Sequence, residues 1–113
     1  MWKWCKEHNK AQFSEAHKAL WGKDSAYNHI RLPWDRPIPT IVQSSESLYH
    51  PEIPRALTIS ELKRCGGFPD DFILSGTRGQ QWERIGRAVP PVMMSHIATT
   101  IRDDILGKIK TAP

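Results

Sequence analysis

The sequence predicts a small α+β fold with short strands and about four helices. The chain has 113 residues, fewer than the roughly 150 that a six-stranded doubly wound sheet with its helices requires. Nine prolines disfavour a coiled coil and a pure helical bundle, because proline interrupts a helix beyond its first turn. Helix-start signals and short alternating segments both occur, so we expect helices and strands in one domain.

The first expected helix covers residues 12–22. Apolar residues are spaced along one helical face and a glycine follows them, at Phe13, Ala16, Leu20 and Gly22. The next segment is rich in proline, which favours extended chain and loop. Within it, apolar side chains alternate around Thr40, so we expect a short strand there.

The helix expected over residues 59–65 has the clearest start signal. Thr58 and Glu61 form a capping box, in which the Thr hydroxyl accepts from the Glu amide and the Glu carboxylate accepts from the Thr amide. Leu57 and Leu62 are expected to form a hydrophobic staple at the start of this helix. Gly66 and Gly67 are expected to end it with positive φ angles. A turn, a short strand around Ile73 and a helix over 80–86 follow.

The last expected helix covers residues 91–106 and opens at two prolines, where a missing amide costs little. Plotted at 100° per residue, its apolar side chains share one arc, at Met93, Met94, Ile97, Ala98, Ile101 and Ile105. Asp104 and Lys108 interrupt that arc, so we expect tight packing over about the first three turns. The face packs either on a separate partner or within the core of this chain.

The cysteine content indicates the cellular compartment of the protein, whereas its charge does not identify a binding partner. The net charge is +4 and the pI is about 9.3, which is compatible with nucleic acid and also common elsewhere. Cys5 and Cys65 form no disulfide framework, and no apolar stretch is long enough for a membrane span. We therefore expect a protein of the reducing cytoplasm that does not enter a membrane.

The sequence contains no convincing catalytic or metal site. Cys5 and His8 have a zinc-like spacing, but no second pair of ligands accompanies them, so we expect no metal. Ser60 and Lys63 match one acylase spacing without its companion motifs. A glycine-rich phosphate loop is absent, and the adjacent aspartates diverge rather than forming a catalytic pair.

From Arg31 onward, three ordered segments resemble the C-terminal part of DNA (cytosine-5) methyltransferases. Residues 32–41 resemble the family's recognition-region segment that ends in a Thr-Leu or Thr-Ile pair, here Thr40-Ile41. Residues 50–72 resemble the ninth motif, with Gly67-Phe68-Pro69-Asp70-Asp71-Phe72 at its end. Gln81-Trp82-Glu83-Arg84-Ile85-Gly86-Arg87-Ala88-Val89-Pro90-Pro91 and the helix after it resemble the tenth motif.

The resemblance implies two parts with different tasks. Residues 1–80 would be a partial target-recognition domain that binds double-stranded DNA, with contacts at Arg36, Thr40, Ile41 and Arg78. An ordinary strand threonine is the alternative for Thr40. Residues 81–113 would place a helix on the Rossmann-like catalytic domain, which is absent from this chain and would come from a missing N-terminal part or a separate catalytic subunit.

The tenth-motif segment would lie beside S-adenosylmethionine, at Gly86, Arg87, Ala88 and Val89. The family normally has Asn after this glycine, and Arg87 cannot accept a hydrogen bond. Backbone contact around Gly86 and Ala88 is therefore the firmer expectation.

The family's chemical groups for methyl transfer are missing. Neither cysteine follows proline, as the family's nucleophile does, and the Glu-Asn-Val, Gln-x-Arg-x-Arg and Phe-x-Gly-x-Gly motifs do not occur. We therefore expect no catalytic residue and no methylation by this chain alone. The alternative is a stand-alone, non-enzymatic module that binds DNA or another protein.

Overall fold

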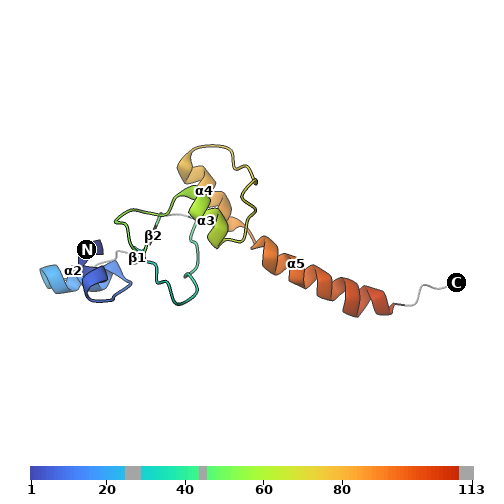
Figure 1. Ribbon diagram of the computed structural model, residues 1–113, viewed down its shortest axis with the longest axis horizontal. Helices are drawn as coiled ribbons and strands as arrows, with labels where there is room; N and C mark the ends of the chain where they lie inside the picture. The colour runs from blue at the N-terminus through green and yellow to red at the C-terminus, as the bar shows by residue number, and fades with distance from the viewer. Residues whose placement is uncertain (25–28, 44–45, 110–113) are drawn as a thin grey trace.

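The computed structural model describes residues 1–24, 29–43 and 46–109. Its elements in order are α1 (Trp2–Glu7), α2 (Phe13–Trp21), β1 (Ile30–Arg31), β2 (Leu48–Tyr49), α3 (Ile59–Cys65), α4 (Arg78–Arg87) and α5 (Pro91–Thr100), followed by a π-helical turn, η1 (Ile101–Ile105), and a 3-10 turn, η2 (Leu106–Lys108). The molecule measures 74 × 29 × 23 Å, because α5 and its two turns project away from the other elements (Figure 1). The small α+β fold is confirmed.

The larger core lies between the two-stranded sheet and the pair α3 and α4. Six buried apolar side chains form it, namely Leu32, Leu48, Leu57, Leu62, Trp82 and Ile85. The strands β1 and β2 are parallel, with Ile30 opposite Leu48 and Arg31 opposite Tyr49. This core fixes the loops that border α3 and α4, which carry most of the candidate site.

A smaller core joins α1 to α2 around Cys5, Phe13 and Ala16. It is tied to the turn after β2, because the Trp2 indole Nε1 donates to the His50 carbonyl at 3.0 Å. Lys6 adds an ion pair with Glu52 of the same turn at 2.5 Å. The sequence did not predict α1, since six residues are too few to show a helical period.

Three of the predicted helices have their expected start or end signals. Helix α2 ends at Gly22 with φ of 68°, as predicted. Helix α3 covers the predicted range and has both bonds of the capping box between Thr58 and Glu61. Helix α4 begins at Arg78 rather than residue 80, because Thr77 and Gln80 form a second capping box.

The glycine pair after α3 was predicted only half correctly. Gly67 has φ of 74°, as expected, whereas Gly66 stays in the right-handed helical region with φ of −80°. A Cβ on Gly67 would also lie 3.3 Å from a Val92 methyl group. Gly67 therefore allows both the reversal after α3 and the close approach of the start of α5.

Both predicted strands are wrong. Residues 38–42 are extended chain without strand pairing, since Pro37 and Pro39 have no amide to donate to a neighbouring strand. The segment is held instead by α4, where the Trp82 indole donates to the Val42 carbonyl at 3.0 Å. Ile73 is not in a strand either, and its side chain is 89% exposed. The turn before it is held by the Lys63 ammonium, which donates to the carbonyls of Asp70 and Phe72.

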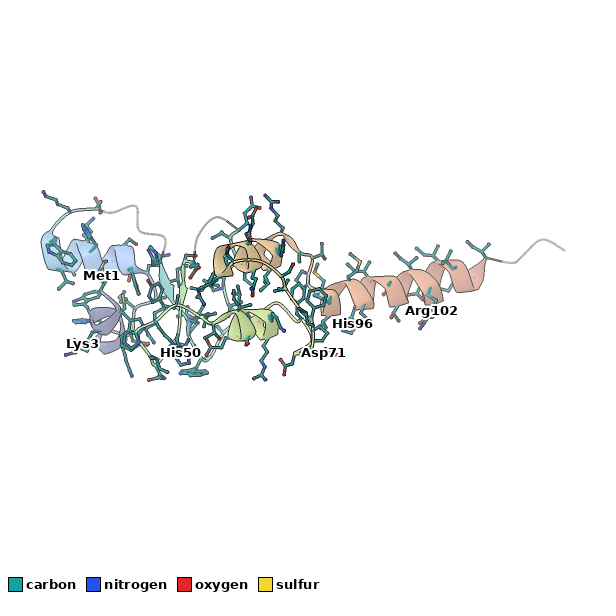
Figure 2. All side chains as sticks on the ribbon, turned by 90° about the horizontal axis from the view of Figure 1, so that it is seen from above. Met1, Lys3, His50, Asp71, His96 and Arg102 are labelled. Atoms are coloured by element: carbon teal, nitrogen blue, oxygen red, sulfur yellow. The ribbon has the colours of Figure 1, made fainter. Side chains whose placement is uncertain are left out.

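The last helix does not pack within the core of this chain, so that alternative is wrong. No residue of α5, η1 or η2 is buried. Helical turns extend to Lys108, slightly beyond the predicted end at 106. Figure 2 shows the side chains of this part standing away from the rest of the molecule.

The described residues contain neither a helix suited to span a membrane nor a cluster of possible metal ligands. None of their helices is long and apolar enough to cross a membrane. Among residues 1–24, 29–43 and 46–109, no group of three or more His, Cys, Asp or Glu side chains is arranged to hold a metal ion.

Candidate functional site

A pocket of about 340 Å³ brings together two segments that lie far apart in the sequence. One wall is the extended segment 38–41, which includes Thr40 and Ile41, and the opposite wall is the end of α4 with Gly86 and Ala88. Cys65, Gly66, Phe68, Ile85 and Pro90 complete the lining. Four of the eight site residues named from the sequence therefore share one pocket.

The two walls meet because α4 packs closely on the segment that follows Ile41. The Trp82 side chain is buried, with 1% of its surface exposed, and it holds Val42 through its indole nitrogen. Gly86 lies one turn further along α4. A Cβ at Gly86 would lie 2.9 Å from the backbone N and Cα of Gln43, closer than real Cβ contacts allow. Glycine is thus required for this contact.

Arg87 points to the outside of this junction. Its Nε donates to the Gln43 side-chain oxygen, and its terminal nitrogen Nη2 pairs with Glu83 at 2.7 Å. Neither Arg87 nor Val89 lines the pocket, and Val89 is exposed. The residue in place of the family's Asn therefore fastens α4 to the extended segment, while Gly86 and Ala88 face the pocket.

Arg36 and Arg78, the other two predicted contact residues, lie outside this pocket. Arg78 pairs with Glu46 at 2.8 Å and donates to the Leu57 carbonyl at 2.6 Å, so it connects α4 to the chain around β2. Arg36 is mostly exposed and lies 3.9 Å from Asp35. The structure brings together the Thr40 and Gly86 segments but not the two arginines.

The pocket lining carries no formal charge. Its side-chain polar groups are the Thr40 hydroxyl and the Cys65 thiol, and the rest is aliphatic, aromatic or backbone. Burial raises the pKa of the Cys65 thiol, and the charge of Glu61 raises it further. The thiol is therefore a poor source of thiolate, and the pocket is suited to bind neutral or apolar groups rather than to perform nucleophilic chemistry.

Sequence reasoning missed the contribution of Cys65 and Phe68 to this pocket. Both lie at the C-terminal end of α3, next to Gly66 and Gly67, where the chain turns towards the pocket. The glycine pair marked the helix end, but nothing in the sequence indicated that segment 38–41 would lie opposite it.

Cys5, the other cysteine, lies away from this pocket. It is fully buried in the smaller core, and its thiol donates to the Gln12 carbonyl at 3.4 Å.

An exposed apolar surface begins directly beside the pocket. Pro90 lines the pocket, and α5 starts at the next residue. The large apolar side chains of the predicted arc are 43–55% exposed and comprise Met93, Met94, Ile97, Ile101 and Ile105. We call this set the α5 apolar surface. These side chains share one side of the helix, and none of them is buried.

The chain matches the family model described as C-5 cytosine-specific DNA methylase over residues 3–103. It is 36% identical over 73 residues to the type II methyltransferase M1.HphI of Haemophilus parahaemolyticus, covering 65% of this chain and 20% of that protein. It is 33% identical over 98 residues to the putative type II methyltransferase M.MJ0563P of Methanocaldococcus jannaschii, covering 86% of this chain and 31% of that protein.

A eukaryotic relative aligns over still more of the chain. DNA (cytosine-5)-methyltransferase 1A of Oryza sativa subsp. japonica is 30% identical over 111 residues, covering 93% of this chain and 7% of that protein. The chain thus spans less than a third of the length of each of these three relatives. No solved structure gave a significant match.

Proposed function

Because this chain belongs to the C-5 cytosine-specific DNA methylase family, we propose that it is the C-terminal, DNA-recognition and cofactor-side part of a DNA (cytosine-5) methyltransferase. Such an enzyme transfers a methyl group from S-adenosylmethionine to cytosine in DNA. Residues 1–80 form the recognition part, and residues 81–113 form the part that docks on a catalytic domain outside this chain.

The α5 apolar surface carries this proposal. At about 25 cal/mol per Å² of apolar area, leaving it in water forgoes a large stabilisation that a partner would provide. A catalytic domain with an apolar face is a partner of the right kind, and it would lie beside the pocket because α5 starts at the pocket edge. The exposure of the α5 apolar surface therefore supports the proposal that this chain is one part of a larger enzyme.

The pocket lining fits part of the cofactor. Its uncharged walls suit an apolar or aromatic portion of S-adenosylmethionine, next to the backbone of Gly86 and Ala88. The charged portions of the cofactor need partners that this pocket does not have, so they would be held by the catalytic domain. When bound, S-adenosylmethionine supplies the methyl group, whereas these residues only form one side of its site.

Thr40 on the opposite wall would face the DNA, with Ile41 beside it. Thr40 is exposed, and its hydroxyl is able to donate to a phosphate oxygen, while Ile41 packs against the larger core and fixes the segment. Contacts of this type set the position of the protein on the duplex. Other side chains of the recognition part would select the bases around the target cytosine.

The catalytic nucleophile would come from outside this chain. Burial is the main cause that raises the pKa of both Cys5 and Cys65, so neither thiol is poised as a thiolate. Attack on carbon 6 of cytosine requires a thiolate within reach of the base. Neither cysteine of this chain is therefore assigned a catalytic role.

The test is transfer of labelled methyl groups from S-adenosylmethionine to cytosine-containing duplex DNA. Tagged chain recovered with its partners from its native cells is compared with the same chain purified alone. We expect activity only in the recovered material. Activity in the lone chain would contradict the missing nucleophile, and activity in neither preparation would favour the alternative of a stand-alone binding module.

A further inference from the structure

A second pocket, of about 350 Å³, lies in the N-terminal part of the chain, and most of its charged side chains are cationic. Its cations are Lys6, Lys10, Arg31 and Arg36, and its anions are Asp35 and Glu52. We call it the cationic pocket. These residues come from α1 and the loop after it, from β1 and the loop after it, and from the turn after β2.

Arg31 lies in the cationic pocket and, in the part of the chain that the structure describes, donates only to backbone carbonyls. Its Nε donates to the Lys10 carbonyl at 3.4 Å, and a terminal nitrogen donates to the Pro51 carbonyl at 3.3 Å. Both acceptors are uncharged, and no carboxylate of the described residues lies within ion-pair distance of Arg31, although the pKa of Glu52 is lowered mainly by its hydrogen bond from Lys6 and also by the charge of Arg31. The Arg31 guanidinium therefore remains able to attract an added anion.

The other three cations have partners that an added anion is able to displace. Arg36 lies 3.9 Å from Asp35, and both side chains are more than 60% exposed. Lys10 lies 3.7 Å from Glu15, again at the surface. Only the pair of Lys6 and Glu52 is short, at 2.5 Å. Exposed ion pairs of this kind contribute little, so exchange for a stronger acceptor costs little.

We propose that the cationic pocket binds a backbone phosphate of duplex DNA. The proposal rests on the proposed function only in naming DNA as the source of the phosphate. A phosphate oxygen accepts from several donors at once, which suits a guanidinium with lysines around it. Trp34 forms an outer wall, held by a bond from its indole nitrogen to Glu52 at 3.0 Å.

The spacing along the chain connects this pocket to the first one. Arg36 lines the cationic pocket and Thr40 lines the other, and four residues of extended chain reach at most about 14 Å. One DNA strand rises about 3.4 Å per nucleotide, so this distance corresponds to about four nucleotides. The two pockets thus contact phosphates on the same short stretch of duplex.

The first test removes one cation at a time. Arg36→Gln and Lys10→Gln are compared with Lys3→Gln, which removes the same charge from α1 outside the pocket, at the end of the molecule far from α5 (Figure 2). Binding of a fluorescent duplex is measured against salt concentration with the whole chain. Each pocket variant is expected to lower the slope of log affinity against log salt by about 1, and Lys3→Gln to leave it unchanged.

The second test uses a variant that is expected to raise the affinity for duplex DNA, an effect that misfolding would not produce. Glu52→Gln removes a negative charge from the cationic pocket and keeps one oxygen to accept from Trp34, while Lys6 loses its acceptor and becomes available to an added anion. Affinity for the duplex at low salt is expected to rise about two- to fivefold. Glu7→Gln, the same change on α1 outside the pocket, is expected to leave the affinity unchanged.

The outcomes separate this proposal from the proposed function. If the pocket variants and Lys3→Gln have equal effects, or Glu52→Gln binds no better than Glu7→Gln, the cationic pocket is not a phosphate site. The methyl-transfer test then still stands, because it does not depend on these variants. If the unaltered chain fails to bind duplex at low salt, the cationic pocket proposal is overturned even where the methyl-transfer test succeeds.

Discussion

Gly86 lies where α4 approaches the extended segment most closely. A Cβ at this position would meet backbone atoms of Gln43 at 2.9 Å, and backbone cannot rotate away as a side chain tip does. Gly86→Ala is therefore expected to destabilise the fold by about 1–3 kcal/mol. Urea unfolding followed by Trp fluorescence measures this difference.

Gly79, in the same helix, is the matched control. A Cβ there would meet no atom within 4 Å. Gly79→Ala is expected to stabilise the fold by up to about 1 kcal/mol, because alanine loses less backbone entropy in a helix. Equal effects of the two substitutions would mean that the close approach at Gly86 is not what holds the pocket walls together.

Glu61 makes the stability of the fold depend on pH. Its two oxygens accept from Arg55 at 2.8 Å, and this pairing lowers the pKa of the carboxyl from 4.5 to about 2. The unfolded chain therefore takes up the proton at higher pH, and stability is lost as pH falls from about 4.5 to about 2. The loss is about 1 kcal/mol, since the side chains are about a third exposed and solvent screens the pair.

Glu61→Gln isolates this effect. Glutamine retains an oxygen for the capping box at Thr58 and has no charge to lose. Urea unfolding between pH 2 and pH 6 is expected to show a smaller dependence on pH in the variant than in the unaltered chain. An unchanged pH dependence would assign the effect to other carboxylates, such as Asp70 beside Arg64.

At the scale of elements, none of the residues of α5 is buried by the described part of the chain. Ile97→Asp and Ile101→Asp alter exposed side chains, so the stability of the chain is expected to change by less than about 0.5 kcal/mol. Recovery of the catalytic partner from cells is expected to fall about tenfold or more, because the proposed interface would bury an unpaired carboxylate.

Thr99→Asp provides the control for the α5 apolar surface. It introduces the same charge in the same helix, outside the predicted apolar arc. Partner recovery with this variant is expected to equal that of the unaltered chain. If Thr99→Asp and Ile97→Asp reduce recovery equally, added charge on α5 matters and the α5 apolar surface does not.

The π-helical turn η1 changes how the apolar side chains of the last helix line up. In an α-helix, four residues pass slightly beyond one turn, so a row of every fourth residue drifts around the axis. A π turn is wider, and four residues fall short of one turn, so the drift reverses between Ile101 and Ile105. Asp104 and Lys108 pair with each other at 3.4 Å, which partly neutralises the two charges.

At the scale of the whole molecule, the extended shape is itself testable. The radius of gyration is 19.1 Å, whereas a compact chain of 113 residues has about 13 Å. Small-angle scattering of the dilute lone chain is expected to give a value near 19 Å. A value near 13 Å would mean that α5 folds back onto the core, which would remove the main support for a docking surface.

Local signals predicted the helices well. Capping boxes, terminal glycines and apolar spacing act between residues a few positions apart, so the sequence carries them directly, as at Thr58 with Glu61 and at Gly22. The strands around Thr40 and Ile73 were wrong because alternation of side chains says nothing about whether a neighbouring strand is available. The short helix α1 was missed since it is held by the distant turn at His50.

The sequence by itself determined the fold class, the family resemblance, the helices from residue 13 onward and the apolar arc of the last helix. Only the tertiary structure decided that Thr40 and Gly86 line one pocket, that Arg87 faces away from it, and that the described residues leave the last helix unburied. The physical reason is the range of the interactions. Caps and helical periods join near neighbours, whereas the pocket depends on Trp82 and Gly86 meeting a segment about 40 residues earlier in the chain.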